Sequence, residues 1–143
     1  MDPEWAKNLA ARKKSELEVK RLQQEKDLND RKLLDTNADK MWVEVRRAAA
    51  ACCKELNSSM GSDYIKFEGA SYHNSFTLIT PEATYTATFS PQTCSPQTWL
   101  LSAQEITYTL VIAEGNIVLW KDAQGNTLPS EKVAQNIVGA AFR

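Results

Sequence analysis

Apolar and polar residues follow two different periods along the chain, and the change falls at Gly61. From Pro3 to about Met60 the sequence has no glycine and no further proline. Ala, Leu, Lys, Arg, Glu and Gln predominate there, which is the composition of an α-helix. After Gly61, short runs rich in Tyr, Ile, Phe, Thr and Val favour strands. The sequence therefore predicts a long N-terminal helix followed by a sheet.

The second half of the predicted helix carries one apolar stripe. Its members recur at spacings of three and four residues, so they share one helical face: Met41, Trp42, Val45, Ala48, Ala49, Cys52 and Leu56. A face of this kind can pack on a sheet. We expect Cys52 to be a small core residue within it.

The first part of the predicted helix, residues 7–40, has no such stripe. Its leucines fall on two separate sides, Leu17 with Leu28 and Leu22 with Leu33. We expect this part to be stabilised by pairs of opposite charge four residues apart, each contributing only about 0.2–0.5 kcal/mol. Such a segment is marginal as an isolated helix and gains stability by pairing with something else.

A second helix-start signal lies inside the predicted helix. Thr36 and Asp39 have the spacing of a capping box just before the apolar stripe. The helix therefore either kinks or restarts near residues 35–38, or continues through them. We place the domain boundary here, so that residues 1–36 form a charged projecting helix and residues 37–143 form one α+β domain.

Five strands are predicted after Gly61, because apolar residues alternate with polar ones between turn residues. They lie at residues 63–68, 76–79, 83–89, 105–113 and 117–121. Residues 99–101 either form a strand of their own or extend the following one. A meander of about five antiparallel strands is the expected sheet.

A short helix is predicted at the C-terminal end, where Pro129 and Ser130 follow a turn at residues 122–126. Its apolar residues form an inward stripe: Val133, Ala134, Ile137, Val138 and Ala141. We expect this helix to pack on the sheet. Strands in a run between two helices define an α+β fold with an antiparallel sheet, not a parallel α/β fold.

Composition and net charge indicate no particular class of partner. The chain has 143 residues, with 17 basic and 18 acidic side chains and a formal net charge of −1. This balance gives no reason to expect a nucleic acid or an anionic membrane as partner. The beginning of the sequence lacks the apolar stretch of a secretory signal, and three cysteines suit reduced thiols. We expect a soluble protein of the cytoplasm.

Residues that carry catalytic or metal chemistry are scarce. His73 is the only histidine, in a predicted turn, and no pattern pairs it or Cys94 as nucleophile and base. Cys-x-x-Cys and His-x-x-x-His spacings are absent, as is a glycine-rich phosphate loop. We therefore expect no enzyme activity, no cofactor and no metal. Whether Cys94 is a reactive thiol stays open.

Two classes of function fit these features. In the first, the protein is a non-enzymatic protein–protein interaction or oligomerisation module. Its binding residues are Trp5 and Leu9, an apolar patch before the charged stretch, which docks on a protein partner or a second copy. The alternative for this patch is docking within its own chain. In the second class, the protein carries a small apolar ligand in a pocket between the sheet and the helix around Trp42.

Overall fold

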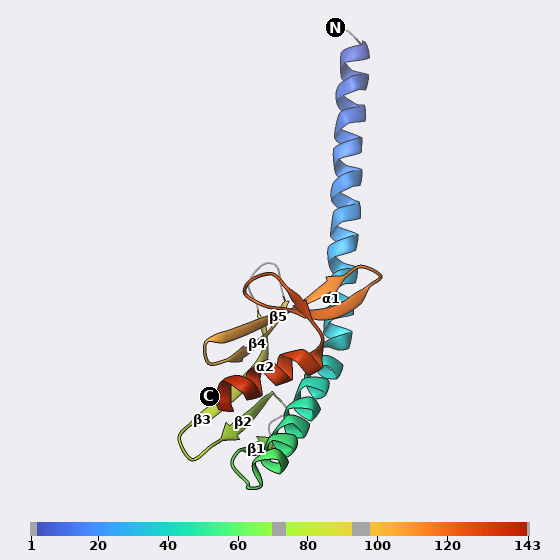
Figure 1. Cartoon of the computed structure of the whole chain (residues 1–143). Coiled ribbons are helices and arrows are strands. Elements are labelled where there is room, and N and C mark those ends of the chain that lie inside the picture. The colour runs from blue at the N-terminus through green and yellow to red at the C-terminus, as the bar shows by residue number, and fades with distance from the viewer. Residues whose placement is uncertain (1–2, 70–73, 93–97, 143) are drawn as a thin grey trace. The chain divides into compact units, whose positions relative to one another are not determined.

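The computed structural model describes residues 3–69, 74–92 and 98–142. The chain divides into two compact units, Met1–Lys32 and Leu33–Arg143. A long helix, α1 (Pro3–Met60), precedes an antiparallel sheet, and a short helix, α2 (Ser130–Phe142), follows it (Figure 1). The predicted α+β class is confirmed. The expectations for His73 and Cys94 fall outside the described residues.

Seven strands form the sheet within the described residues. They are β1 (Lys66–Gly69), β2 (Ser75–Ile79), β3 (Thr84–Gln92), β4 (Thr98–Ala103), β5 (Ile106–Ala113), β6 (Ile117–Lys121) and β7 (Thr127–Leu128). Strands adjacent in sequence are adjacent in the sheet and pair antiparallel, so the sheet is a meander. The predicted count of five was too low. β4 is a strand of its own, and β7, with two residues, is too short for periodicity to reveal.

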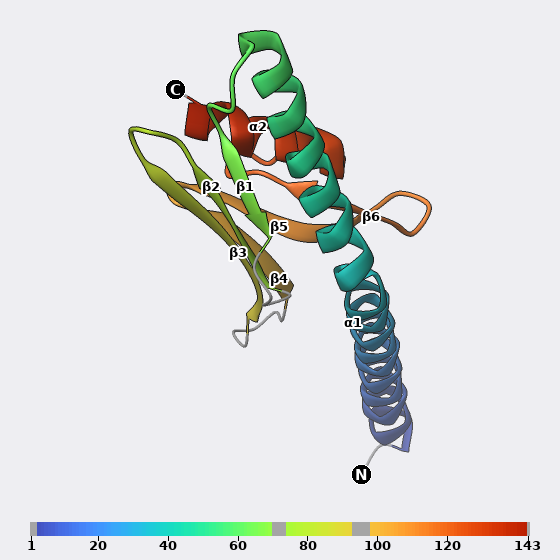
Figure 2. The same cartoon turned by 90° about the horizontal axis from the view of Figure 1, so that it is seen from below.

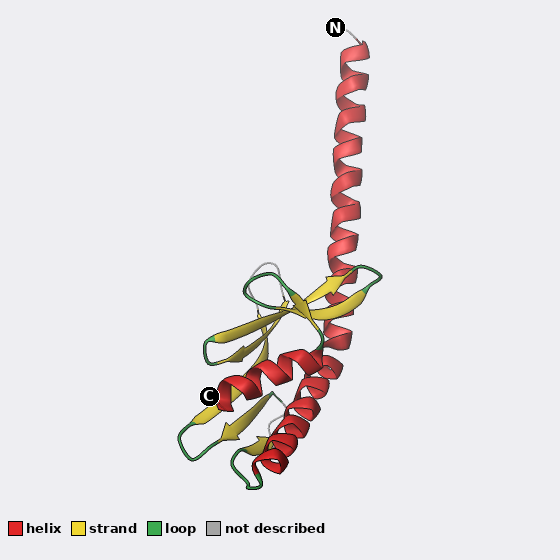
Figure 3. Ribbon diagram, in the orientation of Figure 1, coloured by secondary structure: helices red, strands yellow, loops and turns green. Residues whose placement is uncertain are grey.

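The sheet curves, and one of its faces packs against α2 and residues 33–60 of α1 (Figures 2 and 3). Alternation along β3 shows how the sequence selects this face. Ala87 and Phe89 are buried, whereas Thr86 and Thr88, between and beside them, are exposed. Side chains of successive strand residues point to opposite faces, so the threonines form the outer, polar face.

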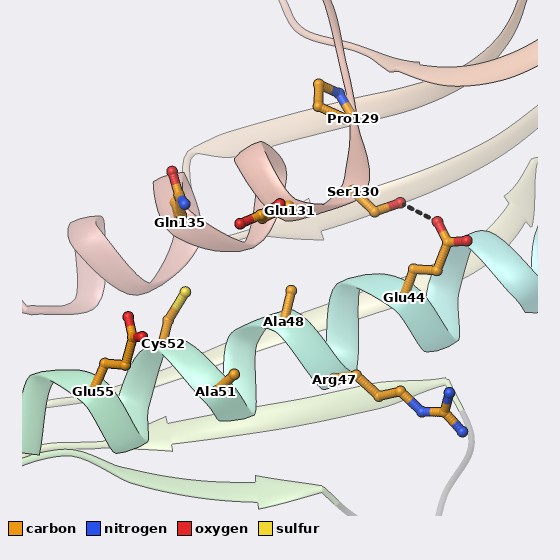
Figure 4. A pocket seen from close by; sticks show the side chains of 10 residues that line it. All are labelled: Glu44, Arg47, Ala48, Ala51, Cys52, Glu55, Pro129, Ser130, Glu131 and Gln135. Atoms are coloured by element: carbon orange, nitrogen blue, oxygen red, sulfur yellow. Dashed lines mark hydrogen bonds between the residues drawn. The ribbon is translucent and has the colours of Figure 1, made fainter.

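Residues 33–60 of α1 bury the predicted apolar stripe in the core. Four of its members are buried, namely Met41, Trp42, Val45 and Ala49, and Ala38 and Cys53 outside the predicted stripe are buried with them. The remaining members, Ala48, Cys52 and Leu56, are partly buried against the core. The core cysteine is therefore Cys53, at 3% exposure, and not Cys52, which is half-buried at the edge. The difference arises because Cys52 lies on the flank of the stripe that faces α2, as Figure 4 shows.

The helix continues without a break through residues 35–38, so of the alternatives left open by the sequence, a restart does not occur. Polar side chains at this point have other partners. The side-chain amide of Asn37 donates to the carbonyl of Leu33, one turn earlier, at 2.8 Å, and Trp99 Nε1 donates to Asp35 Oδ1 at 2.8 Å. These contacts support a continuing helix anchored to β4, rather than a new N-terminus.

The end of α1 is fixed by its last residues and Gly61. Gly61 has a φ of +72°, which favours glycine, and its N–H donates to Ser58 O at 3.3 Å. The N–H of Ser62 donates to Asn57 O at 3.2 Å, completing a Schellman motif. The Asn57 side chain then accepts from the N–H of Ile65 at 2.9 Å and donates to its carbonyl at 2.8 Å. The path from α1 into β1 is thus held by one side chain.

The unit Met1–Lys32 consists of the first part of α1, and every residue from Pro3 to Asn29 is exposed. Arg21 forms ion pairs with Glu18 and Glu25, three residues before it and four after. These pairs have the helical spacing expected from the sequence. Exposed pairs of this kind contribute little stability each.

Candidate functional site

The predicted partner-binding residues, Trp5 and Leu9, lie one turn apart on α1 and have 60% and 49% of their surface exposed. Residues four apart share one helical face, and the next two positions on that face, seven and eight residues after Trp5, are Arg12 and Lys13. The beginning of α1 therefore presents a face made of two large apolar side chains followed by two cations.

The charge around this face differs from that of the remaining unit. Residues 5–14 contain four basic side chains and no acidic one, whereas residues 15–32 contain five of each. The other large exposed apolar side chains of the unit lie in this second, neutral stretch: Leu17, Val19, Leu22 and Leu28. Apolar surface and uniform positive charge thus coincide only in residues 5–14 among the described residues of this unit.

A second surface feature belongs to the unit Leu33–Arg143. An open groove of about 540 Å³ runs between α1 and α2, with Ala48, Ala51 and Cys52 on its α1 side (Figure 4). A further hollow of about 350 Å³ shares Cys52 with the groove and continues it over Leu56 and Val138. The floor of this long groove is therefore made of small and apolar side chains.

Carboxylates line the groove above its apolar floor. Glu44 and Glu55 come from α1, and Glu131 comes from the first turn of α2. Arg47 also lines the groove, but Figure 4 shows its side chain extending away from α2. Burial raises the pKa of the Cys52 thiol, and the nearby charges of Glu55 and Glu131 raise it further. The groove is therefore acidic.

A hydrogen-bonded chain joins the two helices at one end of the groove. Trp120 Nε1 donates to Ser130 Oγ at 3.0 Å, and the Ser130 hydroxyl donates to Glu44 Oε2 at 3.1 Å. Ser130 is 6% exposed and Trp120 is fully buried, so this chain satisfies an indole N–H that would otherwise lie unpaired in the core. It fixes the start of α2 against α1 and holds one carboxylate of the groove in place.

The space between α1 and the sheet, where the ligand pocket of the carrier hypothesis was predicted, contains packed aromatic rings. Trp42 stacks on Phe76 and Phe89, with ring centroids 5.5 and 5.3 Å apart. Phe89 also stacks on Trp99 at 4.9 Å and meets Trp120 edge to face at 5.5 Å. The carrier hypothesis stays a prediction. The open groove lies between α1 and α2, not between α1 and the sheet.

Two kinds of feature are not found among the residues the structure describes: a cluster of metal ligands and a membrane-spanning helix. In that part of the chain, no three His, Cys, Asp or Glu side chains come together in a way that could hold a metal ion. No helix there is both long enough and apolar enough to cross a membrane. Burial raises the pKa of the Cys52 thiol and raises that of the Cys53 thiol to about 11.

Sequence reasoning predicted Trp5 and Leu9 as binding residues, and the structure shows them exposed, but it did not predict the groove. Part of it has a readable signal, since Glu44, Ala48, Ala51 and Glu55 recur at helical spacing beside the core stripe. The contribution of Glu131 has no such signal, because only the packing of α2 against α1 brings it to the same groove.

Comparison with known proteins adds no functional information. No protein family, no characterised protein and no solved structure matches this chain.

Proposed function

We propose that the protein is a non-enzymatic protein–protein interaction or oligomerisation module that binds through Trp5 and Leu9. The observation that carries the proposal is the exposure of these two side chains together on a helical face, 60% and 49%. Large aromatic residues are enriched among the residues that dominate interface energies. A solvated helix that had no partner would gain nothing from a tryptophan at this position.

The size of the patch limits how it binds. Burying a large apolar side chain contributes about 1.5–3 kcal/mol, so Trp5 and Leu9 together supply about 3–6 kcal/mol. Association of two proteins costs an estimated 4–15 kcal/mol in lost freedom of motion. The two side chains are therefore anchors that need further contacts, and the cations Arg12 and Lys13 on the same face are suited to supply them.

Light scattering after size-exclusion chromatography tests this proposal. Wild-type protein is expected to associate at micromolar concentration, and the Trp5→Ala, Leu9→Ala variant is expected to be monomeric with an unchanged melting temperature. Leu17→Ala with Leu22→Ala is the matched control, because these exposed leucines lie outside the patch, and it should associate like wild type. A monomeric wild type together with a lower melting temperature for the patch variant would show that the patch packs within its own chain.

A further inference from the structure

The groove between α1 and α2 has the dimensions of a site for a short helix. Its lining residues on α1 extend from Glu44 to Ser59. At about 1.5 Å per residue this stretch is roughly 22 Å long, and residues 5–14 as a helix are roughly 15 Å long. An amphipathic helix laid into an apolar groove is a recurring mode of recognition, with anchors at spacings of three, four and seven residues. Trp5, Leu9 and Arg12 have such spacings.

Charge makes the match specific. Glu44, Glu55 and Glu131 give the groove a negative rim, and Arg47 extends away from α2. Residues 5–14 carry four cations and no carboxylate. Residues 15–32 carry five acidic side chains beside five basic ones, so they are less well matched to that rim than residues 5–14. Complementary charge of this kind steers association and selects the partner.

We propose that the groove between α1 and α2 receives residues 5–14 from a second copy of the chain. Trp5 and Leu9 pack on the apolar floor formed by small residues of α1 and by the half-buried Leu56. Arg12 and Lys13, which share their face, meet the carboxylates of the rim. The inference rests on the proposed function, because it names the surface to which the Trp5 and Leu9 patch binds.

Two charge-reversal variants test the pairing. In the segment variant, Arg12 and Lys13 become glutamate. In the groove variant, Glu55 and Glu131 become lysine. Both pairs of residues are exposed, so neither change should disturb folding, and thermal melts of each variant check this. Glu44 is left unchanged because it accepts the hydrogen bond from Ser130.

Each variant alone should associate roughly 10- to 100-fold more weakly than wild type, because like charges then face one another. An equimolar mixture of the two should recover association, since each segment then finds a groove of opposite charge. The control variant reverses Lys7 and Lys14, which lie on the other side of the helix from Trp5, and should stay within about threefold of wild type. Wild-type association should also weaken as salt is raised.

The possible outcomes separate this inference from the proposed function. If the Trp5→Ala, Leu9→Ala variant is monomeric while the groove variant associates like wild type, the patch binds elsewhere and the groove inference is wrong. If the mixture fails to associate, the pairing of segment and groove is wrong. If wild-type protein is monomeric in every condition, the groove inference is wrong, whereas the proposed function then requires a different protein as the partner of the Trp5 and Leu9 patch.

Cross-linking distinguishes a second copy from the same chain. A carbodiimide joins a lysine amine directly to a nearby carboxylate, and mixing light and ¹⁵N-labelled copies marks the links between molecules. Links from Lys13 to Glu55 or Glu131 that carry mixed labels support docking between copies. The same links with unmixed labels only would mean that the segment returns to its own groove, which overturns the inference.

Discussion

The two units of the chain use the same helix in opposite ways. In the unit Leu33–Arg143, α1 buries one regular apolar stripe against the sheet, and Val45 and Ala49 are fully inaccessible. In the unit Met1–Lys32, α1 is equally helical, but every residue from Pro3 to Asn29 is exposed. Helix-forming residues therefore determine how far the helix extends, and the spacing of its apolar residues determines where it packs.

Two tryptophans on α1 put this difference in its simplest form. Trp42 is 3% exposed and stacks on two phenylalanines, whereas Trp5 is 60% exposed. The same side chain is a core residue in one unit and, in our proposal, a binding residue in the other. Substitutions at the two positions should therefore change different properties of the protein.

The largest expected effect comes from replacing Trp42 with alanine. Removing a buried aromatic ring should lower the free energy of unfolding by about 3–5 kcal/mol. Trp5→Ala should change it by less than about 0.5 kcal/mol, because an exposed side chain loses no packing within the chain. Urea unfolding followed by circular dichroism, at protein concentrations low enough to prevent association, measures both. Similar losses for the two variants would contradict the division into a structural and a binding tryptophan.

Truncation shows where the exposed part of α1 ends and the part that packs in the core begins. Deleting residues 1–32 should leave a cooperative unfolding transition. Deleting residues 1–36 should leave one too, which tests the sequence-based prediction that residues 37–143 form an autonomous domain. Deleting residues 1–36 should cost about 2–4 kcal/mol more, because it removes the partly buried Leu33 and Leu34 and the hydrogen bond from Trp99 to Asp35. Urea titration of both forms gives the difference. Asp35→Asn in the full chain is the control, since it keeps an acceptor for Trp99.

A smaller effect is expected at the junction of α1 and α2. Ser130→Ala should lower the free energy of unfolding by about 1–3 kcal/mol, because the buried Trp120 N–H loses its acceptor. Glu44→Gln should cost less, since an amide oxygen still accepts from the Ser130 hydroxyl. A double-mutant cycle by urea unfolding should give a clear coupling between positions 44 and 130. Additive losses would mean that the two side chains act independently.

Periodicity predicted the helices and most strands well because their apolar faces are regular. The stripe around Trp42 and the alternation along β3 can be read from sequence without knowing what they pack against. Contacts between distant residues could not be read in this way. Thr36 and Asp39 looked like a helix start, and the hydrogen bond that Trp99 donates to Asp35, 64 residues earlier, is a contact that no local pattern reveals.

The candidate site shows the same limit. Trp5 and Leu9 could be found because they are local, an apolar pair beside a charged stretch. The groove is formed by α1 and α2, and no short stretch of the sequence indicates that these two helices lie together. The adjacent cysteines show that one position along the helix is enough to change burial. A rotation of about 100° separates neighbouring residues on a helix, and it decides which of the two thiols is buried.

The smallest expected effect is a loss of stability at alkaline pH that depends on Cys53. Burial raises the pKa of this thiol from 9.0 to about 11. The folded state therefore keeps the proton longer than the unfolded state does. This contribution to stability is fully present below the unfolded pKa and is lost as pH rises from about 9 towards 11. Urea midpoints across that range measure it.

Burial also raises the pKa of Tyr85 and Tyr108, so the Cys53 contribution must be taken as the difference between wild type and Cys53→Ala. The variant should be less stable near neutral pH, where its smaller side chain leaves space in the core, and the two curves should converge as pH rises. Curves that stay parallel would show that the thiol does not titrate differently in the folded and unfolded states. Cys52→Ala is the matched control, because the thiol of Cys52 is less buried and faces the groove, and its curve should run closer to that of wild type.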